Sequence, residues 1–410
     1  MLLLEFSAAL GRFMGLLDTG FAFSDWNNFF LQLGKIAERK RIVVVIDEFP
    51  YLVESVPEIA GILQRAWDLE LKRTKVFLAV SGSHYHMMVQ EFTSEKRPLF
   101  GRTTGQILLN EVSPDQLHMF LPHYGADQIV ETFSVIGGVP KYLEMWDDSK
   151  PVLKNIADAL LSPVTIFRQE PMFLIQDEIA EPRTYLAILE ALGKGALTPK
   201  DISIATGIAL PHIGNYLQTL LMLGFIRKII SLTAEDPTAT RMSHYEICDP
   251  YLRFYFRFVH PHLSLLEQNR NGKVIEIIEQ GFTNYVAKHG FEEICRRRII
   301  KMGDEGKLPF FPLSVGRFWN KQSEIDVVAI NKKEQVVLVG ECKWTQNKIG
   351  EDVLDDLIAK TRTFHQISDY RFHYALFSKN GFTKGLNNRI KRDSIFLFES
   401  TQKDLLILKQ

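Results

Sequence analysis

The sequence has 410 residues, of which 46% are hydrophobic and 24% charged, and a formal net charge of −1 at pH 7. This length predicts two or three domains with packed cores, and the composition excludes a disordered chain. No apolar run approaches the ~20 residues that span a bilayer, and the run at residues 2–4 is too short for a signal peptide, so we expect no membrane partner. Three cysteines without metal-ligand spacing predict a reducing, cytoplasmic location: Cys248, Cys295 and Cys342.

The first 40 residues predict helical structure. Residues 24–26, Ser-Asp-Trp, are typical of a helix N-cap before an amphipathic segment at 29–37. We expect this helix to pack beside a sheet that residues 42–46 join. Hydrophobic side chains recur at helical spacing before the cap: Phe6, Leu10, Phe13 and Leu17.

Residues 42–46 are five consecutive aliphatic residues followed by Asp47 and Glu48. This pattern predicts a strand buried on both faces of a parallel sheet, with two acids at its carboxyl end. A predicted helix at 59–72 and a second strand at 76–83 complete a βαβ unit. In a nucleotide-hydrolysing site Asp47 would hold the water shell of Mg²⁺, and Glu48 would orient or deprotonate the attacking water. The alternative is a buried strand that ends in two solvated acids.

Five segments, in this order, resemble the archaeal-type ATPases of the signal-transduction branch of the AAA+ superfamily over residues 27–260: 45–52, 63–68, 81–83, 98–103 and 137–143. The resemblance implies ATP and Mg²⁺ as cofactors. It also implies that Arg102 stabilises phosphate charge, that Ser81 senses the γ-phosphate, and that Pro140 lies near the adenine base. The alternatives are a turn with solvated Arg97 and Arg102, a buried small residue at 81, and a simple turn at 137–140.

The phosphate loop of that family, G-x-x-x-x-G-K-[ST], is missing from this sequence. Met1 falls where the family has already completed its loop and first helix. The alternatives are a lost gene beginning, a late start site, or absence by design. We therefore expect weak nucleotide binding and little hydrolysis, because acids cannot replace the amide cradle. An absent first strand would also leave one flank of the sheet uncovered, which predicts poor solubility or association through that flank.

Residues 113–175 resemble the family's helical lid, in which the glycines of 137–140 allow close backbone approach. From 185 to 258 the pattern changes to helix, turn, helix and strands, which resembles a winged helix-turn-helix with its recognition helix at 211–223. Arg227, Lys228 and Arg241 lie near the wing. The exposed candidates on the recognition helix include no arginine or lysine, which favours a protein partner over DNA: His212, Asn215, Gln218 and Thr219.

A second constellation lies near the C-terminus, where strands at 323–330 and 336–344 form a hairpin. If the turn is centred between residues 333 and 334, Asp326 lies opposite Glu341, and Lys343 projects from the same face as Glu341. Two carboxylates and a lysine on one patch suit Mg²⁺-dependent phosphodiester cleavage. The alternative is a surface hairpin with a solvated Glu and Lys pair.

This hairpin resembles the PD-(D/E)XK nuclease fold, in the form of the domain commonly fused to these ATPases. The resemblance implies that Asp326, Glu341 and the helix acid Glu292 hold the metal and that Lys343 positions the nucleophile. Ile325 stands where the fold often has proline. Residues 296–298, three arginines, could meet a phosphate backbone, and Cys342 is expected on the opposite face as a core residue.

Together these patterns predict an α/β protein with a truncated P-loop NTPase core at 1–112, a helical lid at 113–175, a winged helix at 176–260 and a nuclease-like domain at 261–410. The leading hypothesis is an ATP-binding, hydrolysis-impaired ATPase that regulates the C-terminal domain. A Mg²⁺-dependent DNA endonuclease and a non-enzymatic interaction module are the alternatives. Nucleotide, DNA and a protein bound through the winged helix are the candidate partners.

Overall fold

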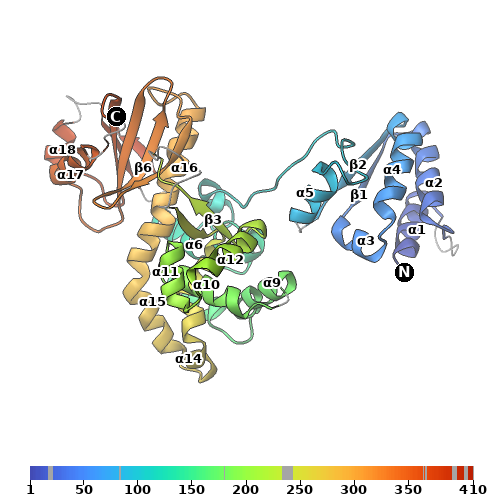
Figure 1. Ribbon diagram of the computed structural model, residues 1–410, viewed down its shortest axis with the longest axis horizontal. Coiled ribbons are helices and arrows are strands. Elements are labelled where there is room, and N and C mark those ends of the chain that lie inside the picture. The colour runs from blue at the N-terminus through green and yellow to red at the C-terminus, as the bar shows by residue number, and fades with distance from the viewer. Residues whose placement is uncertain are drawn as a thin grey trace. The chain divides into compact units, whose positions relative to one another are not determined.

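The computed structural model describes residues 1–16, 22–82, 85–179, 181–232, 243–362, 364, 367–389, 395–400 and 405–409. They form a mixed α/β protein with two compact units, residues 1–109 and 110–410 (Figure 1). No helix in these ranges has the length and hydropathy that a membrane crossing needs. Three residues named above lie outside the described residues: Leu17, Ser83 and Arg241.

The N-terminal unit contains a βαβ arrangement, as predicted. Strands β1 and β2 pair in parallel, with Ile42 opposite Val76. The predicted N-cap is also confirmed, because the Asp25 carboxylate accepts a hydrogen bond from the backbone N–H of Asn28 at 2.8 Å. The elements are α1 (Leu2–Phe13), α2 (Trp26–Arg39), β1 (Ile42–Ile46), α3 (Phe49–Ser55), α4 (Ile59–Leu69), η1 (Leu71–Arg73), β2 (Val76–Val80) and α5 (Tyr85–Thr93).

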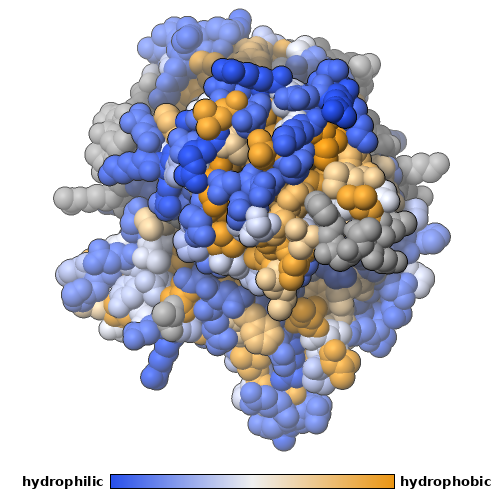
Figure 2. Space-filling model, turned by 90° about the vertical axis from the view of Figure 1, so that its right-hand side faces the viewer, coloured by the Kyte–Doolittle hydropathy of each residue, from blue (hydrophilic) through white to orange (hydrophobic). Residues whose placement is uncertain are grey.

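The prediction that β1 is buried on both faces is wrong. Ile42 and Ile46 are buried against the aromatic residues of α2, but Val43 and Val45 are each 64% exposed and Phe77 on β2 is 54% exposed. The helices of this unit cover one face of the two-stranded sheet, so the aliphatic run has a buried and an exposed side. Figure 2 shows hydrophobic side chains among hydrophilic ones on the side of the molecule that it presents.

The C-terminal unit begins with a run of short helices. The Gly137–Gly138 boundary permits the close approach that the sequence predicts. The backbone N–H of Val112 donates to the carbonyl of Gly138 at 2.8 Å, and a Cβ on Gly138 would lie 1.9 Å from the Val112 oxygen. The elements are η2 (Pro114–Met119), α6 (Ala126–Ile136), α7 (Pro140–Glu144), α8 (Val152–Asn155), η3 (Ile156–Leu160), η4 (Ile166–Arg168) and α9 (Glu170–Glu178).

Three helices and a two-stranded antiparallel sheet follow. Thr198 caps the second helix through a reciprocal capping box with Asp201, and Gly207 ends that helix in the left-handed region at φ 74°. The hairpin pairs Ile226 with Ile247. The elements are α10 (Arg183–Gly193), α11 (Pro199–Thr206), α12 (Leu210–Met222), β3 (Ile226–Ile229) and β4 (His244–Ile247).

A helical segment then leads to α15 (Asn271–Val286) and α16 (Glu292–Asp304), which are joined by one π turn, η7 (Ala287–Phe291). The segment before α15 consists of α13 (Pro250–Phe254), η5 (Tyr255–Val259), η6 (His260–His262) and α14 (Leu263–Glu267). The chain ends in β5 (Ser314–Trp319), β6 (Glu324–Asn331), β7 (Val336–Lys343), α17 (Glu351–Thr361), β8 (Arg371–Ser378), α18 (Lys384–Arg389), β9 (Ile395–Glu399) and β10 (Ile407–Lys409).

The C-terminal strands form one mixed sheet in the order β10-β9-β8-β7-β6-β5. The pairs β7–β8 and β8–β9 are parallel, and the other pairs are antiparallel. Residues of α16 pack on one face of this sheet, and residues of α17 and α18 pack on the other. The first of these cores also includes residues from segments 113–175 and 176–260, so the predicted lid, winged helix and C-terminal domain share a hydrophobic core in this structure.

Candidate functional site

The β6–β7 hairpin has the predicted register. Val327 pairs with Gly340, so the next position brings Asp326 opposite Glu341. The Asp326 carboxylate accepts a hydrogen bond from the backbone N–H of Cys342 at 2.8 Å. Lys343 reaches back to the Glu341 carboxylate at 2.8 Å, as expected for residues two apart on one strand. The hairpin therefore brings two carboxylates and a lysine together.

A further lysine joins this group from α17. The ammonium of Lys360 lies 2.8 Å from the second oxygen of Glu341, whose side chain is 9% exposed. Both carboxylate oxygens of Glu341 therefore have a cationic partner. Lys360 could not be predicted from the sequence, because nothing in the local pattern of α17 links it to a hairpin that precedes it in the chain.

Burial and mutual repulsion raise the pKa values of the neighbouring acids. Burial, followed by the charge of Glu341, raises the pKa of Asp326 to about 6. Burial, followed by the charge of Asp326, raises the pKa of Glu292, at the start of α16, to about 8. Burial alone would lower the pKa of Lys343, but the hydrogen bond and charge of Glu341 outweigh it, so that this pKa is raised. The acids predicted from the sequence thus lie close enough to perturb one another.

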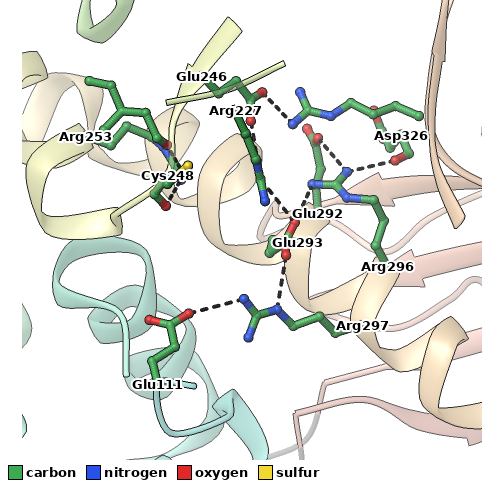
Figure 3. A network of polar contacts seen from close by, with 12 residues as sticks. Glu111, Arg227, Glu246, Cys248, Arg253, Glu292, Glu293, Arg296, Arg297 and Asp326 are labelled. Carbon is green, nitrogen blue, oxygen red and sulfur yellow. Dashed lines mark hydrogen bonds and ion pairs between the residues drawn. The ribbon is translucent and has the colours of Figure 1, made fainter. Parts of the chain in front are cut away.

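Arg296 connects α16 to this site. Its guanidinium donates to the backbone carbonyl of Asp326 at 2.9 Å and forms ion pairs with Glu292 at 3.4 Å and Glu293 at 3.3 Å (Figure 3). Arg297 is also paired, with Glu293 at 3.1 Å and Glu111 at 3.2 Å. These two arginines, which the sequence suggested could meet a phosphate backbone, therefore form ion pairs within the protein.

The carboxylates fit a magnesium site only in part. In the described ranges, no three histidine, cysteine, aspartate or glutamate side chains converge closely enough to hold a metal ion. Asp326 and Glu341 remain as a pair of hard oxygen ligands. A pair suits Mg²⁺, which usually takes one or two carboxylates and completes its shell with water and phosphate oxygens. Glu292, held by Arg296, is not grouped with them as a third ligand in this structure.

The N-terminal unit brings together Asp47 and Ser81 at the carboxyl ends of β1 and β2. The Ser81 hydroxyl donates to the Asp47 carboxylate at 2.5 Å, and the backbone N–H of Glu48 donates to the same oxygen at 3.1 Å. Glu48 adopts a left-handed conformation, φ 49°, that turns the chain into α3. Asp47, Glu48 and Ser81 are all exposed, so they form an open polar edge.

Arg102 and Pro140, the two other residues that the resemblance to the ATPases singled out, lie in different units of the chain. The Arg102 guanidinium forms an ion pair with Asp68 on α4 at 2.8 Å and donates to the carbonyls of Pro98 and Phe100. The hydrogen bonds that Arg102 donates to the Asp68 carboxylate lower the pKa of Asp68. Pro140 belongs to the other unit, where it begins α7 after the Gly137–Gly138 boundary.

The hairpin β3–β4 packs against the edge strand β5. The backbone N–H of Leu232 donates to the carbonyl of Arg317 at 3.1 Å, and the ring of His244 stacks on Trp319 at 4.2 Å. Arg317 also forms an ion pair with the buried Glu246 at 2.5 Å. Arg227 on β3 lies 3.4 Å from the same carboxylate. One edge of this hairpin is therefore occupied by the C-terminal sheet.

Fold and site together describe a mixed α/β protein with a carboxylate and lysine cluster on its C-terminal sheet. A family model described as archaeal and bacterial proteins of unknown function, DUF234, matches residues 255–353, which include Glu292, Asp326, Glu341 and Lys343. The chain is also 31% identical, over 366 residues, to an uncharacterized protein of Methanocaldococcus jannaschii. That alignment covers 88% of this chain and 79% of the relative, so the chain belongs to the same family as this archaeal protein.

Proposed function

We propose that the C-terminal unit is a Mg²⁺-dependent nuclease that hydrolyses phosphodiester bonds of DNA. The observation that supports this most is the hairpin register, which places Asp326 opposite Glu341, with Lys343 2.8 Å from the Glu341 carboxylate. A paired carboxylate site next to a lysine on a mixed sheet is the arrangement expected of a PD-(D/E)XK nuclease.

Each residue has a role that follows from its contacts. Asp326 and Glu341 provide the oxygen ligands, and when bound the ion would activate water and shield the charge of the scissile phosphate. Lys343 and Lys360 each form an ion pair with Glu341, and Lys343 can donate to the attacking oxygen or to the phosphate. Arg296 fixes the backbone of Asp326 from the opposite face of the sheet.

The experiment is incubation of the full chain with supercoiled and branched DNA in Mg²⁺ or Mn²⁺. We expect Lys343→Ala and Asp326→Asn to lower the cleavage rate at least ~100-fold, the scale on which loss of a transition-state contact acts. Lys332→Ala is the matched control, because Lys332 is an exposed residue of the same hairpin turn. Equal cleavage by wild type and Lys343→Ala, or none by either, would contradict the proposal.

We also propose that the N-terminal unit binds ATP and regulates the C-terminal unit. Asp47 and Ser81, hydrogen bonded at the carboxyl ends of parallel strands, support this, because ligands of α/β sheets bind at that edge. For the 410-residue chain, whose sequence contains no G-x-x-x-x-G-K-[ST] motif, we expect weak binding and little hydrolysis. Titration with ATP and Mg²⁺ tests it: Asp47→Asn should weaken binding, and rapid ATP turnover that depends on Asp47 and Glu48 would show the expected impairment to be wrong.

Helices α10–α12 with β3–β4 are proposed to be a winged helix that serves protein packing rather than DNA reading. The contact of Leu232 and His244 with β5 supports this role. If neither activity is found, and binding of a protein partner survives substitution of Asp47, Glu341 and Lys343 together, the chain is a non-enzymatic interaction module.

A further inference from the structure

A small pocket lies in the C-terminal unit, apart from the hairpin carboxylates Asp326 and Glu341. It has a volume of about 30 Å³ and is lined by residues of α6, β3, β4, α13, η7, α16 and β5, together with Glu111 and Cys248. Its charged lining consists of six arginine and lysine side chains and three glutamates, an excess of three positive charges. We call it the basic pocket. Its size admits only the tip of a ligand, not a ribose or a base.

Two polar side chains of the basic pocket have no hydrogen-bond or ion-pair partner among the described residues. Within the described part of the chain, neither the ammonium of Lys288 nor the ring nitrogens of His289 form a hydrogen bond or ion pair, although both side chains line the pocket. The His289 ring packs against Tyr285, with ring centroids 4.8 Å apart. The π turn η7 carries both residues into the pocket just before α16 begins. Such turns inside helices are often found at functional sites.

Arg227 lines the basic pocket from β3. It reaches from β3 toward Glu246 and Glu293, but its distances to their oxygens are 3.4 and 3.8 Å (Figure 3). These contacts are longer than the 2.7–2.9 Å typical of charge-assisted hydrogen bonds. The guanidinium therefore retains donor capacity toward the pocket.

The positive field of the pocket also affects the groups around it. Burial alone would raise the pKa of Glu293, but the charges of Arg296, Arg227 and Arg297 lower it to about 2. Burial, followed by the charge of Arg253, keeps the pKa of His289 well below its ordinary value. The cations thus outweigh burial at Glu293, whereas at His289 the charge of Arg253 adds to the larger effect of burial. The glutamates do not neutralise this surplus.

We propose that the basic pocket binds a phosphoryl group, with Lys288 and His289 of η7 and Arg227 of β3 as donors. A phosphoryl group carries a charge of about −1.5 to −2, which offsets most of the excess charge, and its three acceptor oxygens equal the three donors in number. A carboxylate brings one charge and two oxygens. The group belongs either to a 5′-phosphorylated nucleic-acid end or to a free nucleotide, and the chemistry of the pocket is the same for both.

The test is phosphate binding by the full chain in the absence of metal, which separates it from the cleavage activity proposed above. Inorganic phosphate is titrated by calorimetry at constant ionic strength against chloride. We expect saturable binding that Lys288→Ala weakens about tenfold or more, as loss of a charged hydrogen bond does. Lys273→Ala is the control, because Lys273 on the neighbouring α15 is exposed and paired with Glu276.

Competition then identifies the source of the phosphoryl group. A 5′-phosphorylated oligonucleotide that competes with phosphate, when the unphosphorylated strand does not, assigns the pocket to nucleic-acid ends. Competition by ATP but not by adenosine assigns it to nucleotides. Saturable phosphate binding that is unchanged in Lys288→Ala, or no saturable binding by wild type, would overturn the inference. Among the described residues Lys288 forms no hydrogen bond or ion pair, so its truncation breaks no such contact within them.

Discussion

Substitution of the buried Glu246 tests whether charge pairing stabilises the packing of the hairpin β3–β4 on the C-terminal sheet. Burial alone would raise its pKa, but the charges of Arg317, Arg253 and Arg227 lower it to about 2 from the ordinary value of 4.5. A difference of ~2.5 pKa units corresponds to about 3 kcal/mol in favour of the charged, folded form. Glu246→Gln keeps the shape of the side chain and removes this charge. We therefore expect it to lower the free energy of unfolding by about 3 kcal/mol at pH 7.

The sign of the pH dependence follows from the lowered pKa. The folded state holds the proton less tightly than the unfolded state, so the stabilisation is present above pH 4.5 and is lost as the pH falls toward 2. At pH 3 we expect the difference between wild type and Glu246→Gln to be about half its value at pH 7. Urea unfolding of the C-terminal unit, followed by tryptophan fluorescence at several pH values, measures it.

The matched control is Glu276→Gln. The side chain of Glu276 is 56% exposed and pairs with Lys273 three residues away, so we expect a change of less than about 0.5 kcal/mol. The reasoning is refuted if Glu246→Gln costs no more than this control at pH 7. The reasoning is also refuted if Glu246→Gln lowers the free energy of unfolding equally at pH 3 and at pH 7, because the effect would then come from packing and not from charge.

Two further outcomes are expected. Gly138→Ala should destabilise the C-terminal unit by about 3 kcal/mol, because the new Cβ would lie 1.9 Å from the Val112 oxygen. The control is Gly214→Ala, where a Cβ meets nothing within 4 Å, and it should be neutral or slightly stabilising. Thermal unfolding measures both. Lys360→Gln should tighten Mg²⁺ binding about threefold to tenfold, because it removes a cation 2.8 Å from Glu341. Calorimetry measures the affinity, and weaker binding by the variant would contradict the assignment of Glu341 as a ligand.

Local patterns in the sequence were sufficient for several features. The Asp25 cap depends on residues within one turn of a helix, and the pairing of Val327 with Gly340 follows from where a five-residue polar turn lies. That register brings Asp326, Glu341 and Lys343 together without any knowledge of the rest of the fold. The parallel pairing of β1 with β2 was predicted for a similar reason, since a strand, a helix and a strand at this spacing leave few other topologies.

What only the tertiary structure decided concerns partners far apart in the chain. The exposure of Val43 and Val45 depends on which faces of the β1–β2 sheet the helices cover. An aliphatic run has the same sequence whether one face of its strand is buried or both are. Likewise, the pairing of Lys360 with Glu341 and of Arg317 with Glu246 depends on how helices and strands pack. Periodicity and turns act over a few residues, so the sequence determined the elements and their local registers. Burial and charge pairing depend on how all the elements of a unit pack together, and this packing decided which side chains form the site.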